Sequence, residues 1–180
     1  WNSIVVSLST VALTLLFSTP AAYALTRFRF PGREALAGTI LFTYMFAPIM
    51  IIVPFYVMMR FFGLTNTHFG LILAYTAFCL PFGLWMLRTF FQSIPLDIEH
   101  AAMIDGASRF TILTRVTGPL AVPGIATTAI LTFIYCWNEF LFALSFTLGP
   151  DRQPGPGAIA LFRGRHQIPW GVILAAAIIA

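Results

Sequence analysis

The sequence has 180 residues, of which 59% are hydrophobic and 9% are charged. An ordinary soluble domain has roughly 25% charged residues, so this composition argues against a soluble fold. The formal net charge is +4 and every basic residue is Arg, but these arginines punctuate hydrophobic runs instead of forming a basic stripe, so nucleic acid binding is not expected.

Uncharged runs long enough to cross a bilayer follow one another along the chain. A spanning helix takes roughly 20 apolar residues, and residues 1–26, 35–59 and 116–138 contain no Asp, Glu, Arg or Lys. Another apolar run starts near Phe69, after a polar turn. The sequence therefore predicts an all-α polytopic membrane protein, with spans at about 1–26, 35–60, 69–91 and 116–147 and the start of another at 170–180.

Both ends of the sequence have the features of a fragment. No Met and no basic segment precede the first apolar run, and no small-residue cleavage site follows it, so we interpret it as an internal span and not as a signal peptide. The last run, 170–180, would be about 16 Å long as a helix, which is too short to cross a bilayer alone.

Six prolines lie within the predicted spans. Proline removes a backbone donor and clashes with the preceding turn, so kinked helices are expected. The kinks are either packing irregularities or the bends of helices that line a path through the membrane, and the sequence leaves both open. The prolines are Pro20, Pro48, Pro54, Pro81, Pro119 and Pro123.

The arginines predict the orientation, because cytoplasmic loops hold an excess of Lys and Arg. If the turn at 27–34 is inside, the alternation of spans puts 92–115 inside and 61–68 and 149–169 outside. The inside then has Arg27, Arg29, Arg33, Arg88, Arg109 and Arg115, and the outside has Arg60, Arg152, Arg163 and Arg165. We therefore expect 92–115 to be a cytoplasmic loop.

The loop 92–115 contains the signals of a short helix. Pro95 suits the first position of a helix, where its missing N–H is not needed. Asp97 and Glu99 follow in the first turns, where the helix dipole favours carboxylates. Gly106 suits the left-handed residue just past a helix end. We predict a helix over about 95–107 that lies in or below the membrane interface and does not cross the bilayer.

One face of this helix is lined by small residues. Ile98, Ala101, Ala102 and Asp105 stand at i, i+3, i+4 and i+7, which gives a smooth stripe that another protein could approach closely. The helix either connects two spans or docks on a partner. A short exposed helix has little intrinsic stability, which makes a docked partner attractive.

Several motifs along the chain resemble those of ABC importer permeases. The stretch 94–123 resembles the family's EAA loop, and other elements resemble its carbohydrate-uptake, maltose-permease-like branch. The matching elements are Ala101-Ala102, Asp105-Gly106-Ala107, Pro119-Leu120 with Pro123, Trp137-Asn138-Glu139-Phe140, Ala22-Tyr23-Ala24 and Phe30-Pro31-Gly32-Arg33. The sequence departs from the family pattern at His100, where Glu is usual, and at Gly118, where Leu is usual.

The resemblance implies a type I ABC importer permease fold, with 1–180 as a single transmembrane domain that lacks the first helix and the end of the last one. It implies a multi-pass protein of the cell (inner) membrane that takes part in the import of a sugar or sugar derivative. Its implied partners are a second permease subunit, cytoplasmic ATPase subunits that carry ATP and Mg²⁺, and an extracytoplasmic solute-binding protein. The chain has no Gly-x-x-x-x-Gly-Lys-Ser/Thr loop, so we expect no cofactor and no catalytic residue in it.

The resemblance also implies that 95–107 is the coupling helix that sits in a groove of the ATPase. The residues expected to take part in coupling are Glu99, His100, Ala101, Ala102, Asp105 and Gly106. With His100 in place of the usual Glu, the identity of the side chain that makes the polar contact to the ATPase is open.

Glu139 is the only acidic residue within an apolar run, and an ionisable residue in a span is a functional candidate. With Trp137, Asn138 and Phe140 it could line the solute path. Alternatively, Trp137 is an interfacial anchor and the polar pair is a contact between helices. No metal site is expected, because Cys79 and Cys136 lie in apolar segments and the histidines lack ligand spacing.

Two other functions stay open. A permease of the same superfamily for a non-sugar solute has the same motifs. An unrelated channel or intramembrane enzyme is less favoured, because the sequence has neither a filter repeat nor a Gly-x-Ser-x-Gly motif.

Overall fold

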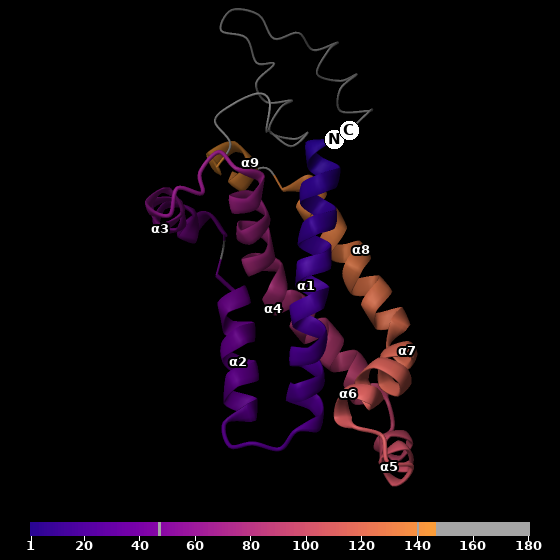
Figure 1. The fold of residues 1–180 in the computed structure, drawn as a ribbon. Helices are drawn as coiled ribbons and strands as arrows, with labels where there is room; N and C mark the ends of the chain where they lie inside the picture. Colours follow the sequence, from indigo (N-terminus) through magenta and orange to yellow (C-terminus); the bar gives the residue numbers. More distant parts are fainter. Residues whose placement is uncertain (47, 140, 147–180) are drawn as a thin grey trace, which may run out of the picture. The chain divides into compact units, whose positions relative to one another are not determined.

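The computed structural model describes residues 1–46, 48–139 and 141–146, and in this part of the chain every regular element is a helix (Figure 1). The elements are α1 (Asn2–Arg27), α2 (Arg33–Tyr44), α3 (Pro48–Phe61), α4 (His68–Ser93), α5 (Leu96–Ile104), α6 (Arg109–Thr111), the π-helix η1 (Ile112–Thr117), α7 (Gly118–Leu120), α8 (Val122–Asn138) and α9 (Leu141–Phe146). The predicted all-α class is confirmed.

The chain divides into two compact units. One takes residues 1–10, 47–76 and 133 onward, and the other takes 11–46 and 77–132. Three long helices, α1, α4 and α8, run through both. The second unit contains the whole segment that was expected to couple to a partner.

The core of the second unit joins the C-terminal halves of α1 and α4 to α2. The phenol ring of Tyr23 meets Phe91 edge to face, with centroids 5.8 Å apart. The alanines at positions 22, 37 and 121 let the helices approach closely, and the leucines fill the space between them. The buried cluster consists of Ala22, Tyr23, Leu25, Ala37, Leu84, Leu87, Phe91 and Ala121.

Aromatic side chains hold the first unit together. Phe142 and Phe146 of α9 are buried, and the ring of Phe55 in α3 lies 6.3 and 5.9 Å from theirs. The backbone N–H of Asn66, in the turn between α3 and α4, donates to the Phe146 carbonyl at 2.7 Å. The short helix α9 is therefore fixed by packing on α3 and by this turn.

Among the described residues, two helices, α1 and α4, are long and apolar enough to cross a membrane, and there are up to four candidate spans if each of two broken pairs counts as one. Pro20 and Pro81 lie inside α1 and α4, which continue through them. The predicted helices at 1–26 and 69–91 therefore agree with the structure.

The segment 35–60 was expected to be one helix, but α2 ends at Tyr44 and α3 begins at Pro48. Proline disfavours helical geometry in the residue before it and lacks the N–H that would continue the ladder, which explains a break at this point.

The segment 116–147 also differs from the single helix expected. It consists of the end of η1, then α7, α8 and α9, and the chain bends by 75° between Arg109–Leu120 and Val122–Asn138. Pro119 and Pro123 flank this bend. The expected loop 149–169 and the last run 170–180 lie outside the described residues.

Candidate functional site

The helix predicted over 95–107 is α5, Leu96–Ile104. Pro95 lies one position before the helix, with φ −58° and ψ 136°, and not at its first helical position as predicted. Gly106 has φ +82°, so the prediction of a left-handed residue after the helix is confirmed. The chain therefore enters and leaves α5 through two residues whose backbone preferences fit their places.

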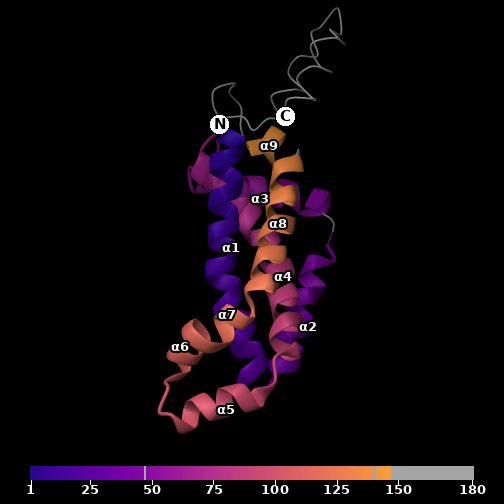
Figure 2. The same cartoon turned by 90° about the vertical axis from the view of Figure 1, so that its right-hand side faces the viewer.

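Nearly the whole surface of α5 is accessible. Figure 2 shows the helix beside α6, within the second unit. Ile104 is 88% exposed and Ile98 40% exposed. Of the residues expected to couple, His100, Ala101, Asp105 and Gly106 are exposed and Ala102 is half-buried.

Glu99 is the one buried residue of α5, at 1% exposure. Its Oε1 atom accepts a hydrogen bond from Arg27 Nε at 2.6 Å and one from Thr117 Oγ1 at 3.1 Å. Its Oε2 atom accepts from the Tyr23 hydroxyl at 3.0 Å. One carboxylate thus joins the C-terminal end of α1, α5 and η1.

The Arg27 guanidinium completes this network. Its Nη2 atom donates to the Ile94 carbonyl at 2.9 Å, just before α5 begins. The side chains of Arg27 and Glu99 are 4% and 1% exposed. Because a buried charge without a partner is costly, each residue depends on the other to stay in this place.

The expected coupling residues therefore divide into two groups. The carboxylate of Glu99 points into its own chain and accepts hydrogen bonds from three side chains. In contrast, His100, Ala101 and Asp105 are exposed. In this structure, Glu99 is a residue that positions the helix.

The partners of Glu99 were not identified as site residues from the sequence. Tyr23 and Arg27 are 76 and 72 positions away from it, and Thr117 is 18 positions away. Only the motif Ala22-Tyr23-Ala24 before Arg27 drew attention to this region, and it carries no information about a contact with Glu99.

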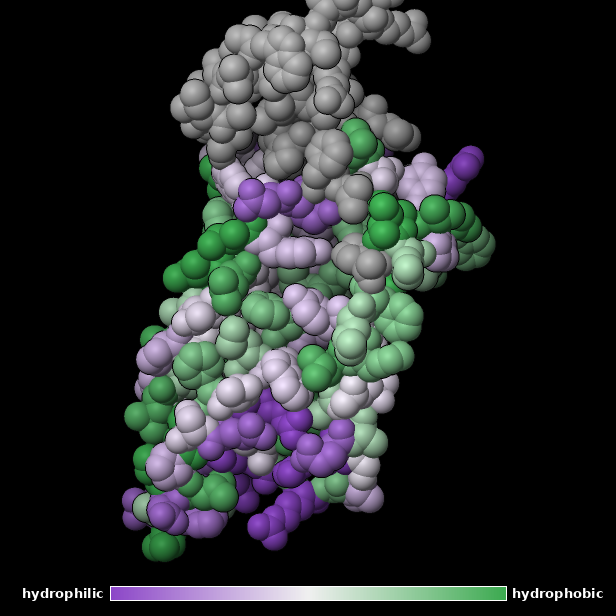
Figure 3. All heavy atoms as spheres, turned by 180° about the vertical axis from the view of Figure 1, so that it is seen from behind, coloured by the Kyte–Doolittle hydropathy of each residue, from purple (hydrophilic) through white to green (hydrophobic). Residues whose placement is uncertain are grey.

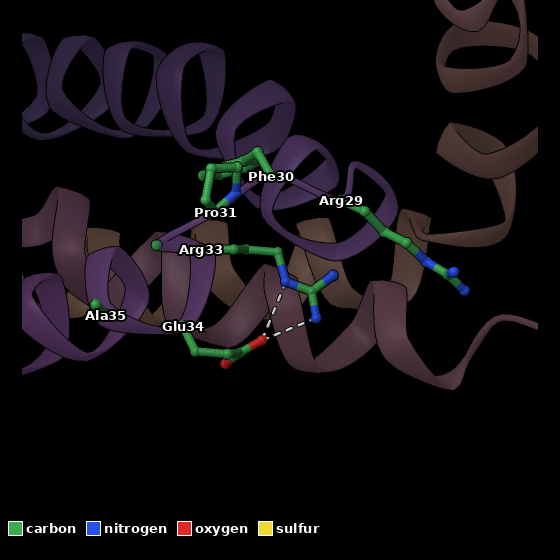
Figure 4. Close-up of a pocket in the computed structure, with 7 residues that line it drawn as sticks. Arg29, Phe30, Pro31, Arg33, Glu34 and Ala35 are labelled. Atoms are coloured by element: carbon green, nitrogen blue, oxygen red, sulfur yellow. Dashed lines mark hydrogen bonds and ion pairs between the residues drawn. The ribbon is translucent and has the colours of Figure 1, made fainter.

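A second ion pair lies at the start of α2. Arg88 of α4 donates from Nη2 to Glu34 Oε2 at 2.7 Å. Arg33 donates from Nη2 to Glu34 Oε1 at 2.8 Å, as Figure 4 shows. The side chain of Arg88 is 9% exposed and the side chain of Glu34 is 65% exposed. The pair fixes the start of α2 against the C-terminal part of α4.

Gly118, which departs from the family pattern, follows the π-helix η1. A Cβ atom at this position would lie 2.5 Å from the carbonyl oxygen of Leu113, a contact that side chains do not make. The wide turn of η1 therefore depends on a glycine here. This gives the substitution of the usual Leu a structural reason.

Residues 137–139 belong to the first unit. The Trp137 ring stacks on Phe133 at 5.5 Å, and Asn138 Nδ2 donates to the Ile134 carbonyl at 2.8 Å. Glu139 Oε2 accepts from the backbone N–H groups of Phe142 and Ala143 at 2.9 and 3.4 Å, so its carboxylate caps the start of α9.

Phe140, the fourth residue expected on the solute path, lies outside the described residues. That 137–140 contact the solute stays a prediction. Within the described part of the chain, no three His, Cys, Asp or Glu side chains form a group that could hold a metal ion.

Comparison with known proteins gives concordant matches. Residues 14–180 match the family described as "Binding-protein-dependent transport system inner membrane component". The chain is 42% identical over 179 residues to the sulfoquinovosyl glycerol transport system permease protein SmoH of Agrobacterium fabrum. This match covers 99% of this chain and 63% of that protein. It is 42% identical over 180 residues to the trehalose transport system permease protein SugB of Mycobacterium tuberculosis, covering 99% of this chain and 66% of that protein.

A solved structure agrees with these matches. The chain is similar, with a TM-score of 0.80 and 31% identity, to a chain of a bacterial ABC transporter involved in the import of the acidic polysaccharide alginate. The match covers 97% of this chain and 62% of that one. The chain therefore spans 62% to 66% of the length of these three proteins.

Proposed function

The chain belongs to the family of inner membrane components of binding-protein-dependent transport systems, and from this premise we propose that it lines the path of an ATP-driven importer for a sugar or sugar derivative. As a member of this family it is a multi-pass inner membrane permease and not an enzyme. ATP hydrolysis then takes place on a separate ATPase, and a binding protein delivers the solute from outside. A second permease subunit completes the path.

The names of the relatives support a sugar as the solute. Two are transport proteins for a sulfoquinovosyl glycerol and for trehalose, and the similar solved structure comes from an alginate importer. A non-sugar solute is the alternative. In the reconstituted complex, binding protein loaded with the right sugar is expected to stimulate ATP hydrolysis, and stimulation only by a non-sugar solute would make the sugar proposal wrong.

The exposure of α5 supports its role as the coupling helix. Its outward face carries Ala101 and Ile104, which lie opposite Glu99 on the helix, and the apolar Ile104 side chain is 88% exposed. A small side chain such as Ala101 allows close approach, and an exposed apolar side chain such as Ile104 can be buried in a groove of the ATPase. Glu99 holds the other face in place, so a push on α5 is passed to α1 and η1.

The roles of the remaining residues follow from this arrangement. His100, Asp105 and Gly106 belong to the ATPase contact or its border, and Ala102 lies between the contact and the buried face. The loop 92–115 is cytoplasmic in this proposal. An extracellular position of the loop, found by labelling a single cysteine at Ser108 in whole cells, would contradict it.

Two substitutions on the outward face test the coupling role. Ala101→Arg and Ile104→Asp in the full-length permease are expected to abolish copurification of the ATPase and uptake, because a long charged side chain blocks the groove and a carboxylate enters an apolar contact. Both should leave insertion and thermal stability unchanged, since neither side chain is buried. Ala101→Ser and Ile104→Leu are the matched controls and should retain uptake. Normal uptake by the first two variants would contradict the assignment.

A further inference from the structure

A cavity of about 440 Å³ lies beside α5, between the end of α1 and Arg109. Arg27, Arg29, Arg109 and His100 line it, and Glu99 is its one acidic residue. Figure 3 shows a group of hydrophilic residues on one face. The residues that line the cavity all belong to the second unit.

The charges around the cavity do not balance. Glu99 is paired with Arg27, which leaves Arg29 and Arg109 without a matching carboxylate in the cavity wall. Among the described residues Arg29 has no hydrogen bond or ion pair, and Figure 4 shows it extending away from Arg33 and Glu34. The Arg109 guanidinium lies over the Phe28 ring at 5.8 Å, and its charge also acts on the Tyr23 hydroxyl.

We propose that this cavity binds a phosphate group. Guanidinium groups present planar sets of N–H donors that match phosphate oxygens, and stacking on an aromatic ring holds such a group in a fixed orientation. The volume accommodates a phosphate with its ester substituent. The two unbalanced positive charges match the charge of a phosphate monoester or of two neighbouring diesters.

The position of the cavity suggests two sources for the phosphate. Arg27 ends the apolar run of α1, so the cavity opens at the level of lipid headgroups, and basic pockets at this depth bind anionic lipids. Phe28 and Phe30 of the same turn are 42% and 40% exposed and could contact acyl chains. A soluble phosphate compound from the cytosol presents the same group. The proposal goes beyond the transport function and does not depend on the solute.

Binding is measured on the purified full-length permease without ATP or binding protein, so the outcome is independent of the transport proposal. Inorganic phosphate and pyrophosphate are titrated against the detergent-solubilised protein by calorimetry, with chloride at equal ionic strength as the reference. Lipid is tested by native mass spectrometry and thermal unfolding after reconstitution in phosphatidylcholine nanodiscs with and without phosphatidylglycerol. Binding of the soluble anions identifies a soluble source, and an effect of phosphatidylglycerol alone identifies a lipid headgroup.

Arg29→Gln and Arg109→Gln should each weaken the binding on the order of tenfold, because each removes a charge-assisted contact. Arg29→Gln is expected to fold normally, since its side chain is exposed. Arg115→Gln is the control, because it removes the same charge at a site outside the cavity. Arg115 is an exposed residue of η1.

Three results would overturn the proposal. The first is that neither soluble anions nor phosphatidylglycerol bind, and the second is that Arg115→Gln weakens binding as much as the cavity variants do. The third is that only the ATPase subunit, and neither phosphate source, protects Arg29 and Arg109 from phenylglyoxal, which would make the cavity a protein contact.

Discussion

The Nε atom of Arg27 lies 2.6 Å from Oε1 of Glu99, although 72 positions separate the two residues in the chain. This contact joins the end of the long apolar helix α1 to α5, a helix that is otherwise largely exposed. Because Glu99 also accepts hydrogen bonds from Tyr23 and Thr117, a single carboxylate links α5 to both α1 and η1.

Glu99→Ala is expected to lower the stability of the full-length permease by about 3–5 kcal/mol, because it leaves the Arg27 charge buried and unpaired. Thermal unfolding in detergent measures the change. His100→Ala, at the exposed neighbouring position, should leave the unfolding temperature unchanged. If both variants unfold at the wild-type temperature, the Glu99 network does not stabilise the fold.

Tyr23→Phe removes one of the three hydrogen bonds to Glu99 and keeps the ring in the core. We expect a loss of about 1.5–3 kcal/mol, as for hydrogen bonds to charged groups. Combining Tyr23→Phe with Glu99→Gln should cost less than the sum of the single changes, because the two groups interact directly. Additive losses in this double-mutant cycle would speak against a direct bond.

The ion pairs of Glu34 predict an unequal effect of its two neighbours. Glu34→Gln should lower the unfolding temperature more than Arg33→Gln does, because the first leaves the buried Arg88 unpaired, whereas Arg33 is exposed to solvent. Equal shifts in the two variants, measured side by side at low salt, would contradict a role of Arg88 in fixing α2.

Gly124 of α8 lies against Phe90 of α4, and a Cβ atom at this position would overlap the phenyl ring. Gly124→Ala is therefore expected to destabilise the protein by about 1–3 kcal/mol through overpacking. Gly38→Ala in α2 is the matched control, because nothing lies within 4 Å of the added atom. There we expect a gain of up to about 1 kcal/mol from the higher helix propensity of Ala.

Glu139 provides a test that separates capping from solute contact. If its carboxylate only caps α9, Glu139→Ala should lower stability by about 1 kcal/mol and leave the dependence of transport on solute concentration unchanged. Glu139→Gln should cost less, since the amide oxygen can still accept from the Phe142 and Ala143 N–H groups. A change in solute preference at unaltered stability would instead place Glu139 on the solute path.

The features set by local chemistry could be predicted from the sequence. The helical class, the short helix between Pro95 and Gly106 and the two unbroken spans depend on composition and on residues close in the chain. The end of α2 at Tyr44 and the break at Ala121 were missed, because a proline within an apolar run either bends a helix, as expected here, or ends it. The tertiary environment of each proline decides between these outcomes. The helices α1 and α4 continue through Pro20 and Pro81, whereas Pro48 begins a new helix.

The candidate site was predicted in part. The exposed face of α5 follows from the helical spacing of Ile98, Ala101 and Asp105. The inward orientation of Glu99 does not, because the same spacing allows a surface carboxylate, and its partners lie on distant segments. Gly118 appeared as a departure from a family pattern, and its reason became visible only with the wide turn of η1.

The 75° bend at Ala121 sets how motion in this region is transmitted. The two helical segments meet at a large angle. A small displacement of α6–α7 along its own axis therefore moves the adjoining end of α8 mainly sideways. If α5 docks on an ATPase as proposed, a push on α5 that reaches α6–α7 would move α8 mainly sideways at its N-terminal end.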